Sequence, residues 1–253
     1  MKRFPIGLQP YTIREELGRD YTGSIERAAQ IGFTGIELGR PPEGMTVAEQ
    51  KALLDRVGLR VIGSHGPFNN LDFSVGELAD YLEEVGGQYI SVSLRFESLD
   101  DLLRKAETLN RHGEAARSRG IQLLYHNHNW EFERFGGEYA LDLLLRETDP
   151  ALVHMEMDTY WVKRGGEDPA DFIRSRLSGR CPLLHIKDVE AGEEQFFAEI
   201  GEGILDFEAI FRAAEEAGTK WLIVEQDASR RPAFESLSIS YGNLSRMNVI
   251  ERP

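Results

Sequence analysis

Four side chains that can bind a metal ion stand at or just after the ends of strand-like runs in this 253-residue chain. They are Glu131 in YHNHNWE, Asp158 in MEMD, His185 in LLHIKD and Glu225 in LIVEQ. Successive members are 27, 27 and 40 residues apart, and the first two separations match one strand with its return helix. Three carboxylates and one imidazole suit a divalent cation. The spacing therefore predicts that these side chains converge at one rim of a sheet.

The composition excludes several classes of protein. A chain of 253 residues with 41% hydrophobic content can bury a large core, and we expect one domain over residues 1–253. A formal charge of -14 would repel phosphate backbones, so no nucleic-acid partner is expected. The single cysteine, the absence of a signal-like amino terminus and the absence of a long apolar run predict a cytoplasmic protein without a membrane partner. Whether the chain forms a homo-oligomer stays open.

A helix-like segment, a glycine and a β-rich run recur from one end of the chain to the other. Gly32 separates the two parts in IERAAQIGFTGIEL, and Gly218 does so in FRAAEEAGTKWLIVEQ. This alternation predicts a parallel sheet, and eight such units in about 250 residues predict an α/β fold that is a single (β/α)8 TIM barrel. An open doubly wound sheet is the alternative, weakened because no GxGxxG follows the first strand.

The expected elements can be given as residue ranges, with ends uncertain by several residues. The expected strands are 5–9, 34–39, 59–64, 89–94, 121–128, 153–158, 181–187 and 221–226. The expected helices are 22–31, 46–57, 75–85, 99–119, 137–147, 169–178, 206–217 and 233–246. In such a barrel the catalytic residues lie at the carboxyl ends of the strands.

Further polar side chains close the expected strands. They are Gln9, Tyr11, Glu37, Ser64, His65, Ser93, Arg95, His126, Asn127, His128, Glu156, Lys187, Asp188 and Asp227. Because side chains alternate faces along a strand, Glu156 should point the same way as Asp158, and His126 the same way as His128. Carboxylates that converge without matching cations repel each other strongly unless they are protonated or bind a metal. The pattern therefore favours a bound cation.

The strings YHNHNWEF, MDTYW, HIKD and VEQD, in this order and at barrel spacing, resemble the sugar phosphate isomerase/epimerase proteins of the xylose isomerase-like barrel superfamily. LQPYTIREE, GSHGPF and GEGILDF extend the resemblance over nearly the whole chain. In that family one divalent cation is held by Glu, Asp, His and Glu from strands five to eight. The resemblance assigns these roles to Glu131, Asp158, His185 and Glu225. Mn²⁺ is the expected ion, with Mg²⁺, Co²⁺ and Zn²⁺ as alternatives.

Glu131 departs from the family pattern, because many relatives place the first glutamate inside strand five, where this chain reads LLYHNH. Glu131 would have to reach back from a loop. His126 or His128 is the alternative ligand, since neutral imidazole binds the same metals. No obvious residues supply the additional carboxylates of a two-metal aldose isomerase, which argues against a hydride shift.

The predicted chemistry begins with removal of a proton from the carbon next to a carbonyl group that the cation polarises. Glu131 and Glu225 are the expected proton carriers, with His126 as an alternative base and Lys187 as a donor to the developing oxyanion. Return of the proton gives epimerisation or isomerisation, whereas loss of a β substituent gives elimination. We therefore expect a metal-dependent isomerase or epimerase acting on a small carbohydrate or keto sugar, with a lyase or dehydratase acting on a keto sugar or inosose as the nearest alternative.

His65, His128 and Trp161 are expected to contact the substrate. Trp161 closely follows Asp158 and would form an apolar wall, although packing against a helix explains it almost as well. A barrel that binds a sugar or a partner without catalysis is a further alternative, and an open position on the cation would distinguish the enzyme. Endonucleases of abasic sites share the superfamily fold, but the acidic charge argues against that activity.

A phosphate on the substrate is a separate question. Arg230 and Arg231 follow strand eight, where barrels often bind phosphate, yet paired exposed arginines are usually solvated. Gly201 and Gly203 could offer backbone amides to an anion, although a turn explains them as well. The sequence leaves open whether the sugar is phosphorylated.

Overall fold

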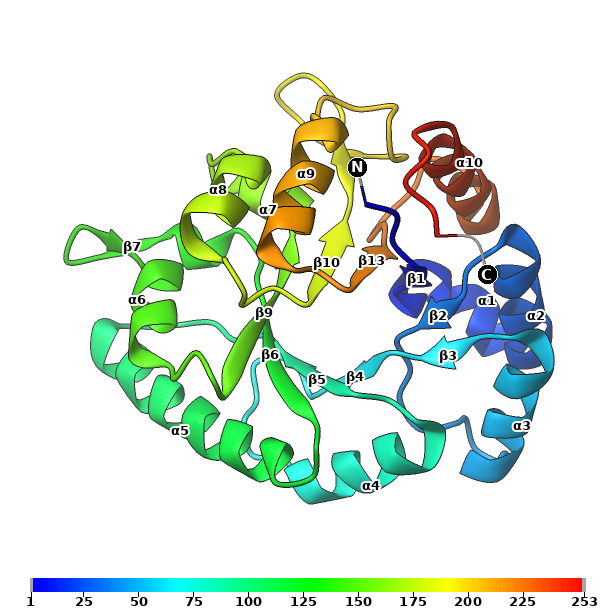
Figure 1. Cartoon of the computed structure of the whole chain (residues 1–253), viewed down its shortest axis with the longest axis horizontal. Helices are drawn as coiled ribbons and strands as arrows, with labels where there is room; N and C mark the ends of the chain where they lie inside the picture. The colour runs from blue at the N-terminus through cyan, green and yellow to red at the C-terminus, as the bar shows by residue number, and fades with distance from the viewer. Residues whose placement is uncertain (1, 252–253) are drawn as a thin grey trace.

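A ring of parallel strands surrounded by helices makes up the computed structural model, which describes residues 2–251 (Figure 1). In order around the ring, the strand segments are β1 (Ile6–Leu8), β2 (Gly35–Ile36), β3 (Arg60–Val61), β4 (Gly63–His65), β5 (Tyr89–Val92), β6 (Gln122–His126), β9 (Val153–Asp158), β10 (Leu183–Ile186) and β13 (Trp221–Val224). All eight predicted strands are present, with ends that differ from the prediction by at most three residues.

One strand is split into two segments, and this strand closes the ring. β3 pairs with β2, whereas β4 pairs with β5. Ile62 lies between the two segments and bonds to both neighbours: its N–H donates to the Ile36 carbonyl, and its carbonyl accepts from the Gln88 N–H, both at 2.9 Å. The nine segments of the sheet therefore act as the eight strands of a (β/α)8 barrel, which confirms the predicted fold.

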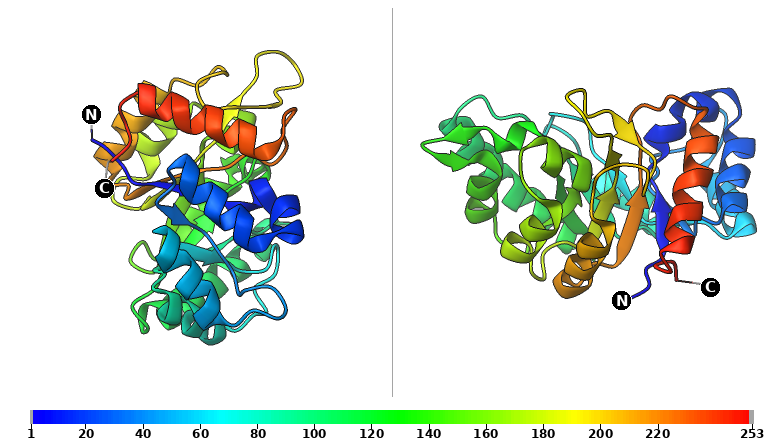
Figure 2. Two further views of the ribbon diagram at one scale, coloured as in Figure 1. Left: turned by 90° about the vertical axis from the view of Figure 1, so that its right-hand side faces the viewer. Right: turned by 90° about the horizontal axis from the view of Figure 1, so that it is seen from above.

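Helices cover the outside of this ring (Figure 1, Figure 2). The long ones are α2 (Tyr21–Ile31), α3 (Val47–Val57), α4 (Val75–Val85), α5 (Leu99–Arg117), α6 (Ala140–Glu147), α8 (Pro169–Arg176), α9 (Phe207–Ala217) and α10 (Ala233–Arg246). Each coincides with a predicted helix, with ends within three residues of the prediction. Across residues 2–251, no helix is both long and apolar enough to cross a membrane.

Short elements at the carboxyl ends of the strands were not predicted. They are η1 (Pro10–Ile13), α1 (Arg14–Arg19), η2 (Trp130–Phe132), α7 (Thr159–Arg164), and the hairpins of β7 (Arg134–Phe135) with β8 (Glu138–Tyr139) and β11 (Asp188–Val189) with β12 (Phe197–Ala198). Such segments are too short to show a hydrophobic period. The β7–β8 hairpin turns through Gly136 and Gly137, with φ of 62° and 94°, and so delays the start of α6 to Ala140.

Side-chain caps and glycines set the ends of the helices. Thr46 begins α3 with a capping box: its hydroxyl accepts from the Glu49 N–H, and the Glu49 carboxylate accepts from the Thr46 N–H. Gly58 ends the same helix with a φ of 77°, a conformation that other residues avoid. Gly218 ends α9 in the same way, with a φ of 81°. These stop signals explain why glycine separates helix from strand in the repeated sequence pattern.

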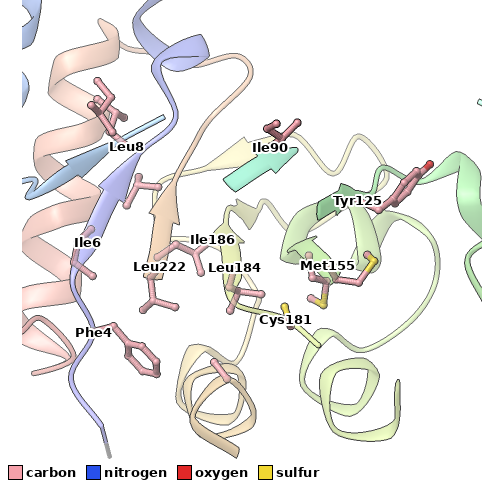
Figure 3. Close-up of a cluster of buried hydrophobic side chains, with 14 of the residues drawn as sticks. Phe4, Ile6, Leu8, Ile90, Tyr125, Met155, Cys181, Leu184, Ile186 and Leu222 are labelled. Carbon is pink, nitrogen blue, oxygen red and sulfur yellow. The ribbon is translucent and has the colours of Figure 1, made fainter. Parts of the chain in front are cut away.

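Alternate side chains of each strand point out of the barrel and into it. Outward side chains such as Ile6, Leu184 and Leu222 belong to the main core between the sheet and the helices, part of which Figure 3 shows. A separate apolar cluster fills the inside of the barrel, made of Ile62, Leu124, Leu183 and Ile223.

Polar side chains follow this inner cluster at the next inward positions. His126 stands two residues after Leu124, and His185 stands two residues after Leu183. Because two residues restore the same face of a strand, these polar groups form a layer above the apolar cluster. The barrel therefore has an apolar floor below a polar mouth at the carboxyl ends of the strands.

Gly35 on β2 leaves room for the interior side chain of Ile62. A Cβ at this position would lie 2.6 Å from Trp221 Cζ3 and 2.8 Å from Ile62 Cδ1. We expect Gly35→Ala to lower the free energy of unfolding by about 1–3 kcal/mol through overpacking, measured by urea denaturation. Gly18→Ala in α1 is the control, since a Cβ there meets no atom within 4 Å, and its effect should lie between zero and a gain of about 1 kcal/mol. Equal effects of the two changes would contradict this packing.

Candidate active site and metal centre

A cavity of about 520 Å³ opens at the carboxyl ends of the strands. Its polar lining includes His65, His126, His128, Lys187, Glu225 and Asp227. Aromatic side chains, among them Tyr11, Phe68 and Trp130, form the remaining part of the wall. The cavity lies where enzymes of this barrel architecture carry their active sites.

Three of the four predicted metal ligands meet at this cavity. Asp158, His185 and Glu225 form one group with His126, and the four candidate ligand atoms lie within 4.8 Å of one another. The group comes from β6, β9, β10 and the residue after β13, which are adjacent in the sheet. His126 therefore takes the place in this group that the sequence assigned first to Glu131 and alternatively to a histidine of YHNH.

The structure does not bring Glu131 into this group. Glu131 lies in η2, is fully buried, and accepts hydrogen bonds from the Tyr125 hydroxyl at 2.8 Å and the His128 N–H at 2.9 Å. Burial raises the pKa of Glu131 to about 8, although its hydrogen bonds act in the opposite direction. Its carboxylate thus holds the loop that carries His128, behind the cavity wall.

A second group of candidate ligands shares His185. It consists of Glu37, His65, Glu156 and His185, again with ligand atoms within 4.8 Å of one another. His185 Nε2 lies 2.9 Å from a Glu37 oxygen, and His65 Nε2 lies 3.1 Å from a Glu156 oxygen. The sequence indicated Glu37 and Glu156 only as polar strand ends and gave them no role. The signal for Glu156 was its position two residues before Asp158, on the same face of the strand.

Hydrogen bonds hold the carboxylates of this second group in place. The Gln9 side-chain amide donates to Glu37 at 2.8 Å, and the Ser91 hydroxyl donates to Glu156 at 3.0 Å. Gln9 follows β1 and Ser91 lies on β5, so strands on both sides of the barrel contribute. Fixed orientations of this kind prepare the oxygen atoms for a ligand.

Lys187 is the permanent cation of the site. Its ammonium group lies 2.9 Å from Asp158, 2.7 Å from Glu225 and 2.9 Å from Asp227. Burial alone would lower the pKa of Lys187, but these three carboxylates outweigh it and hold the pKa well above its ordinary value. The lysine is therefore charged, and all three of its N–H groups have an acidic neighbour.

The buried carboxylates of the site outnumber the single positive charge of Lys187. Glu37, Glu156, Asp158 and Glu225 are all buried. Burial would lower the pKa of His65, yet Glu156 and Glu37 raise it to about 10. The charge balance thus draws protons onto imidazole when no other cation is bound. A divalent cation can supply the same charge, provided that its imidazole ligands give up their protons.

The residues present fit a divalent cation. Glu37 Oε1 is a buried ligand atom that makes no hydrogen bond within residues 2–251. Asp158 Oδ2 contacts the Lys187 ammonium group at 2.9 Å, and Glu156 Oε2 lies 3.1 Å from His126 Nδ1. Unsatisfied buried polar atoms are costly. Carboxylate oxygen and imidazole nitrogen are the donors that Mn²⁺, Co²⁺ and Zn²⁺ accept in proteins. A metal ion at the His126, Asp158, His185 and Glu225 group would add positive charge beside the buried Asp158 and Glu225 carboxylates.

Asp158 shows how the fold positions such a ligand. One carboxylate oxygen, Oδ1, caps α7 by accepting from the Trp161 N–H at 3.0 Å. The Asp158 N–H donates to the Asn127 side chain at 3.0 Å. Both contacts fix the residue and leave Oδ2 directed to the group, so the short helix α7 is part of the site.

Two of the three predicted substrate contacts line the cavity. His65 and His128 form part of its wall. Trp161 lies next to His128, with ring centroids 5.4 Å apart, outside the cavity wall. His128 stacks on Trp130 at 4.0 Å, and burial together with the charges of His126 and Lys187 lowers the pKa of His128 to about 2. His128 is therefore a neutral, partly apolar surface for a ligand.

Comparisons with known proteins agree with the fold. Residues 25–239 match the family described as Xylose isomerase-like TIM barrel. An inosose dehydratase from Lacticaseibacillus casei is 28% identical over 87% of this chain and 88% of its own length. A sugar phosphate isomerase/epimerase crystal structure from Parabacteroides distasonis has a TM-score of 0.84 and 28% identity, covering 99% of this chain and 96% of that one. IolI with bound zinc has a TM-score of 0.73 at 14% identity over 98% of each chain, which shows the shared fold alone.

Glu131→Gln tests the role of the buried acid. The new side chain can accept from the His128 N–H and donate to the Tyr125 hydroxyl, which can in turn donate to the Leu94 carbonyl. Because burial raises the pKa of Glu131 from 4.5 to about 8, the folded protein keeps a proton that the unfolded chain releases. Stability must then fall as the pH rises through this window. The free energy of unfolding should fall less steeply in Glu131→Gln, measured by urea denaturation in EDTA.

Glu131→Ala is the companion variant. It leaves the His128 N–H without its partner and should cost about 1–3 kcal/mol at every pH. If wild type and Glu131→Gln show the same pH dependence, Glu131 is ionised in the folded protein and this description of its environment is wrong.

Proposed function

The chain belongs to the xylose isomerase-like TIM barrel family, and from that premise we propose that it is a divalent-metal-dependent isomerase or epimerase acting on a small carbohydrate or keto sugar. The observation that carries this proposal is the group of His126, Asp158, His185 and Glu225, whose ligand atoms lie within 4.8 Å of one another. The reaction is transfer of a proton at the carbon next to a carbonyl group.

His126, Asp158, His185 and Glu225 would hold the cation, with Mn²⁺ as the proposed ion and Mg²⁺, Co²⁺ or Zn²⁺ as alternatives. When bound, a divalent cation supplies Lewis acidity to the substrate carbonyl. His126 and Glu225 belong both to the ligand group and to the cavity wall, so the metal position borders the space where a substrate binds. This arrangement supports a catalytic role over a purely structural one.

Glu225 is the proposed proton acceptor. Burial would raise the pKa of Glu225, but Lys187 and His185 hold it well below its ordinary value, so the carboxylate is ionised before the reaction starts. Withdrawal of the Lys187 ammonium group toward a substrate oxygen would raise this pKa and make Glu225 a stronger base. His65 also lines the cavity and comes from β4, on another side of the barrel. Proton carriers on two sides allow removal at one face of the substrate and return at the other, which epimerisation needs.

Lys187 is the proposed donor to the negative charge that develops on the substrate oxygen. Its ammonium group already contacts three carboxylates. Asp227 is the most exposed of these three acids, with 22% of its side chain accessible. A substrate oxygen would therefore replace Asp227 beside the ammonium group, while Asp158 and Glu225 keep it oriented.

A dehydratase or lyase is the second candidate function. The specific observation in its favour is the 28% identity to an inosose dehydratase over most of both chains. The first step is the same proton removal by Glu225, and the outcome differs because a hydroxyl group on the next carbon leaves. Lys187 and His65, both at the cavity, carry N–H groups that can assist its departure.

Asp158→Asn tests the metal site, with Asp168→Asn as a matched control. Both aspartates cap a helix through one carboxylate oxygen, and asparagine caps as well as aspartate does. Only Asp158 belongs to the ligand group. After removal of metal with EDTA, added Mn²⁺ should raise the melting temperature of wild type and Asp168→Asn at similar concentrations. Asp158→Asn should need at least about tenfold more Mn²⁺. If Asp158→Asn responds at the same Mn²⁺ concentration as wild type, or if Mn²⁺ does not raise the melting temperature of wild type, this metal site is refuted.

Glu225→Gln tests the chemistry. Unphosphorylated and phosphorylated ketoses, inososes and 3-keto glycosides are incubated with Mn²⁺-saturated protein in D₂O, and NMR follows the protons next to the carbonyl. Wild type should exchange one such proton for deuterium, and Glu225→Gln should exchange it at least about 100-fold more slowly. Rearranged or inverted products support the isomerase or epimerase, whereas an unsaturated or cleaved product supports the second candidate. Unchanged exchange in Glu225→Gln at full metal loading removes Glu225 from the mechanism.

A further inference from the structure

We propose that Glu37 and Glu156 are positioning residues of the metal centre: each accepts the ring proton of one imidazole ligand and so decides which ring nitrogen faces the cation. This inference rests on the proposed function, because it takes the group that contains His126 and His185 as the metal ligands. The second group of candidate ligands then orients the first group and holds no ion of its own.

His185 is shared by the two groups, and its two ring nitrogens face different carboxylates. Nδ1 lies 2.8 Å from Glu225, a member of the ligand group, and Nε2 lies 2.9 Å from Glu37. A ring turned by half a rotation about its Cβ–Cγ bond would place carbon atoms against both carboxylates, so these contacts fix the orientation of the ring. His185 therefore offers Nδ1 to the cation and Nε2 to Glu37.

A neutral imidazole can be a metal ligand in only one of the two groups. One of its ring nitrogens has a free electron pair, and the other carries the proton. When Nδ1 of His185 binds a cation, the remaining proton must stand on Nε2, where Glu37 accepts it. Two ions, one in each group, would require a His185 ring without any proton on nitrogen. We therefore expect one ion per chain.

Glu37 is held in place for this contact. Its side chain is buried, and its Oε2 accepts from the Gln9 side-chain amide at 2.8 Å and lies 3.3 Å from His65 Nε2. Gln9 follows β1, Glu37 follows β2 and His185 lies on β10, so residues of three strands form one series of hydrogen bonds. A fixed carboxylate that accepts from a metal-binding histidine orients the ring and raises the basicity of its other nitrogen.

His126 on β6 has a similar arrangement. Its Nδ1 lies 3.1 Å from Glu156, and its Nε2 lies on the side of the ligand group, 3.9 Å from Asp158. The Ser91 hydroxyl donates to Glu156 at 3.0 Å and so fixes this carboxylate. Each imidazole ligand is therefore next to one buried carboxylate outside the ligand group, and a neutral donor from another strand holds that carboxylate.

Long-range ¹H–¹⁵N correlation spectra of the Zn²⁺-loaded protein, labelled with ¹⁵N in its histidines, test this inference without any substrate. Nε2 couples to both carbon-bound protons of the ring, whereas Nδ1 couples strongly to only one, so the spectra show which nitrogen carries the proton. We expect Zn²⁺ on Nδ1 of His185 with the proton on Nε2, and the opposite arrangement in His126. Loss of a signal in His126→Gln or His185→Gln assigns each ring.

The outcomes separate this inference from the proposed function. The reverse arrangement in either ring, or two Zn²⁺ ions per chain, would overturn the inference and leave the metal centre intact. If Zn²⁺ binds as expected and no carbonyl compound exchanges deuterium, the proposed reaction alone fails. A wild-type protein that binds neither Zn²⁺ nor Mn²⁺ would overturn both.

Glu37→Gln tests the cause. The new amide oxygen can still accept from Gln9 and His185, because Oε1 of Glu37 makes no hydrogen bond within residues 2–251 and the amide nitrogen can take its place. A neutral acceptor binds the Nε2–H group more weakly than a carboxylate does. We expect the Nε2–H proton resonance of His185 to move upfield in the Zn²⁺-loaded variant. The affinity for Mn²⁺, measured from the electron paramagnetic resonance signal of the free ion, should fall about tenfold or more.

Glu199→Gln is the matched control. Glu199 is a buried glutamate that accepts from the Ser236 hydroxyl at 2.7 Å and contacts Arg231 at 2.8 Å, and it belongs to neither group. Its replacement should change neither the His185 resonance nor the affinity for Mn²⁺. Equal losses of affinity in both variants, or an unchanged His185 resonance in Glu37→Gln, would contradict the inference. The spectra of the wild-type protein decide the question if Glu37→Gln does not fold.

Discussion

Buried carboxylates crowd the carboxyl ends of the strands, and their mutual repulsion dictates what must lie beside them. Glu37, Glu156, Asp158 and Glu225 are each at most 7% exposed, and Lys187 supplies one permanent positive charge among them. The remaining charge must come from protonated imidazole or from a metal ion. The barrel therefore offers a strong position for positive charge at the place where a cavity admits a small molecule.

The backbone of the barrel supplies the rigidity that such a site needs. Asp158 is held by the Asn127 side chain and caps α7 with one oxygen, so only its other oxygen is directed to the group. Glu131 holds the loop that carries His128 without entering the cavity. Short elements at the strand ends thus orient the side chains, while the long outer helices enclose the core. Asp188 has a similar structural role, because its buried carboxylate accepts from the Gly201 and Gly203 N–H groups and so shapes the loop before α9.

The sequence predicted the barrel because eight strands and eight helices each have a period or a glycine stop that can be recognised locally. It also predicted Asp158, His185 and Glu225 at one place, because they close parallel strands that lie side by side. Glu131 could not be placed in this way, since the path of the loop after His126 depends on a short η2 helix and on tertiary contacts. Glu156 lies close to His185 because of the register of their two strands, in which His185 pairs with Asp158. This register cannot be read from any local sequence pattern.

The number of imidazole ligands on bound Mn²⁺ tests this account most directly, and electron spin echo envelope modulation of the metal-loaded protein can count them. The group of His126, Asp158, His185 and Glu225 predicts two nitrogen ligands in wild type and one in His126→Gln. A single nitrogen in wild type would point to a carboxylate in place of His126, and Mn²⁺ without any imidazole ligand would contradict the site altogether.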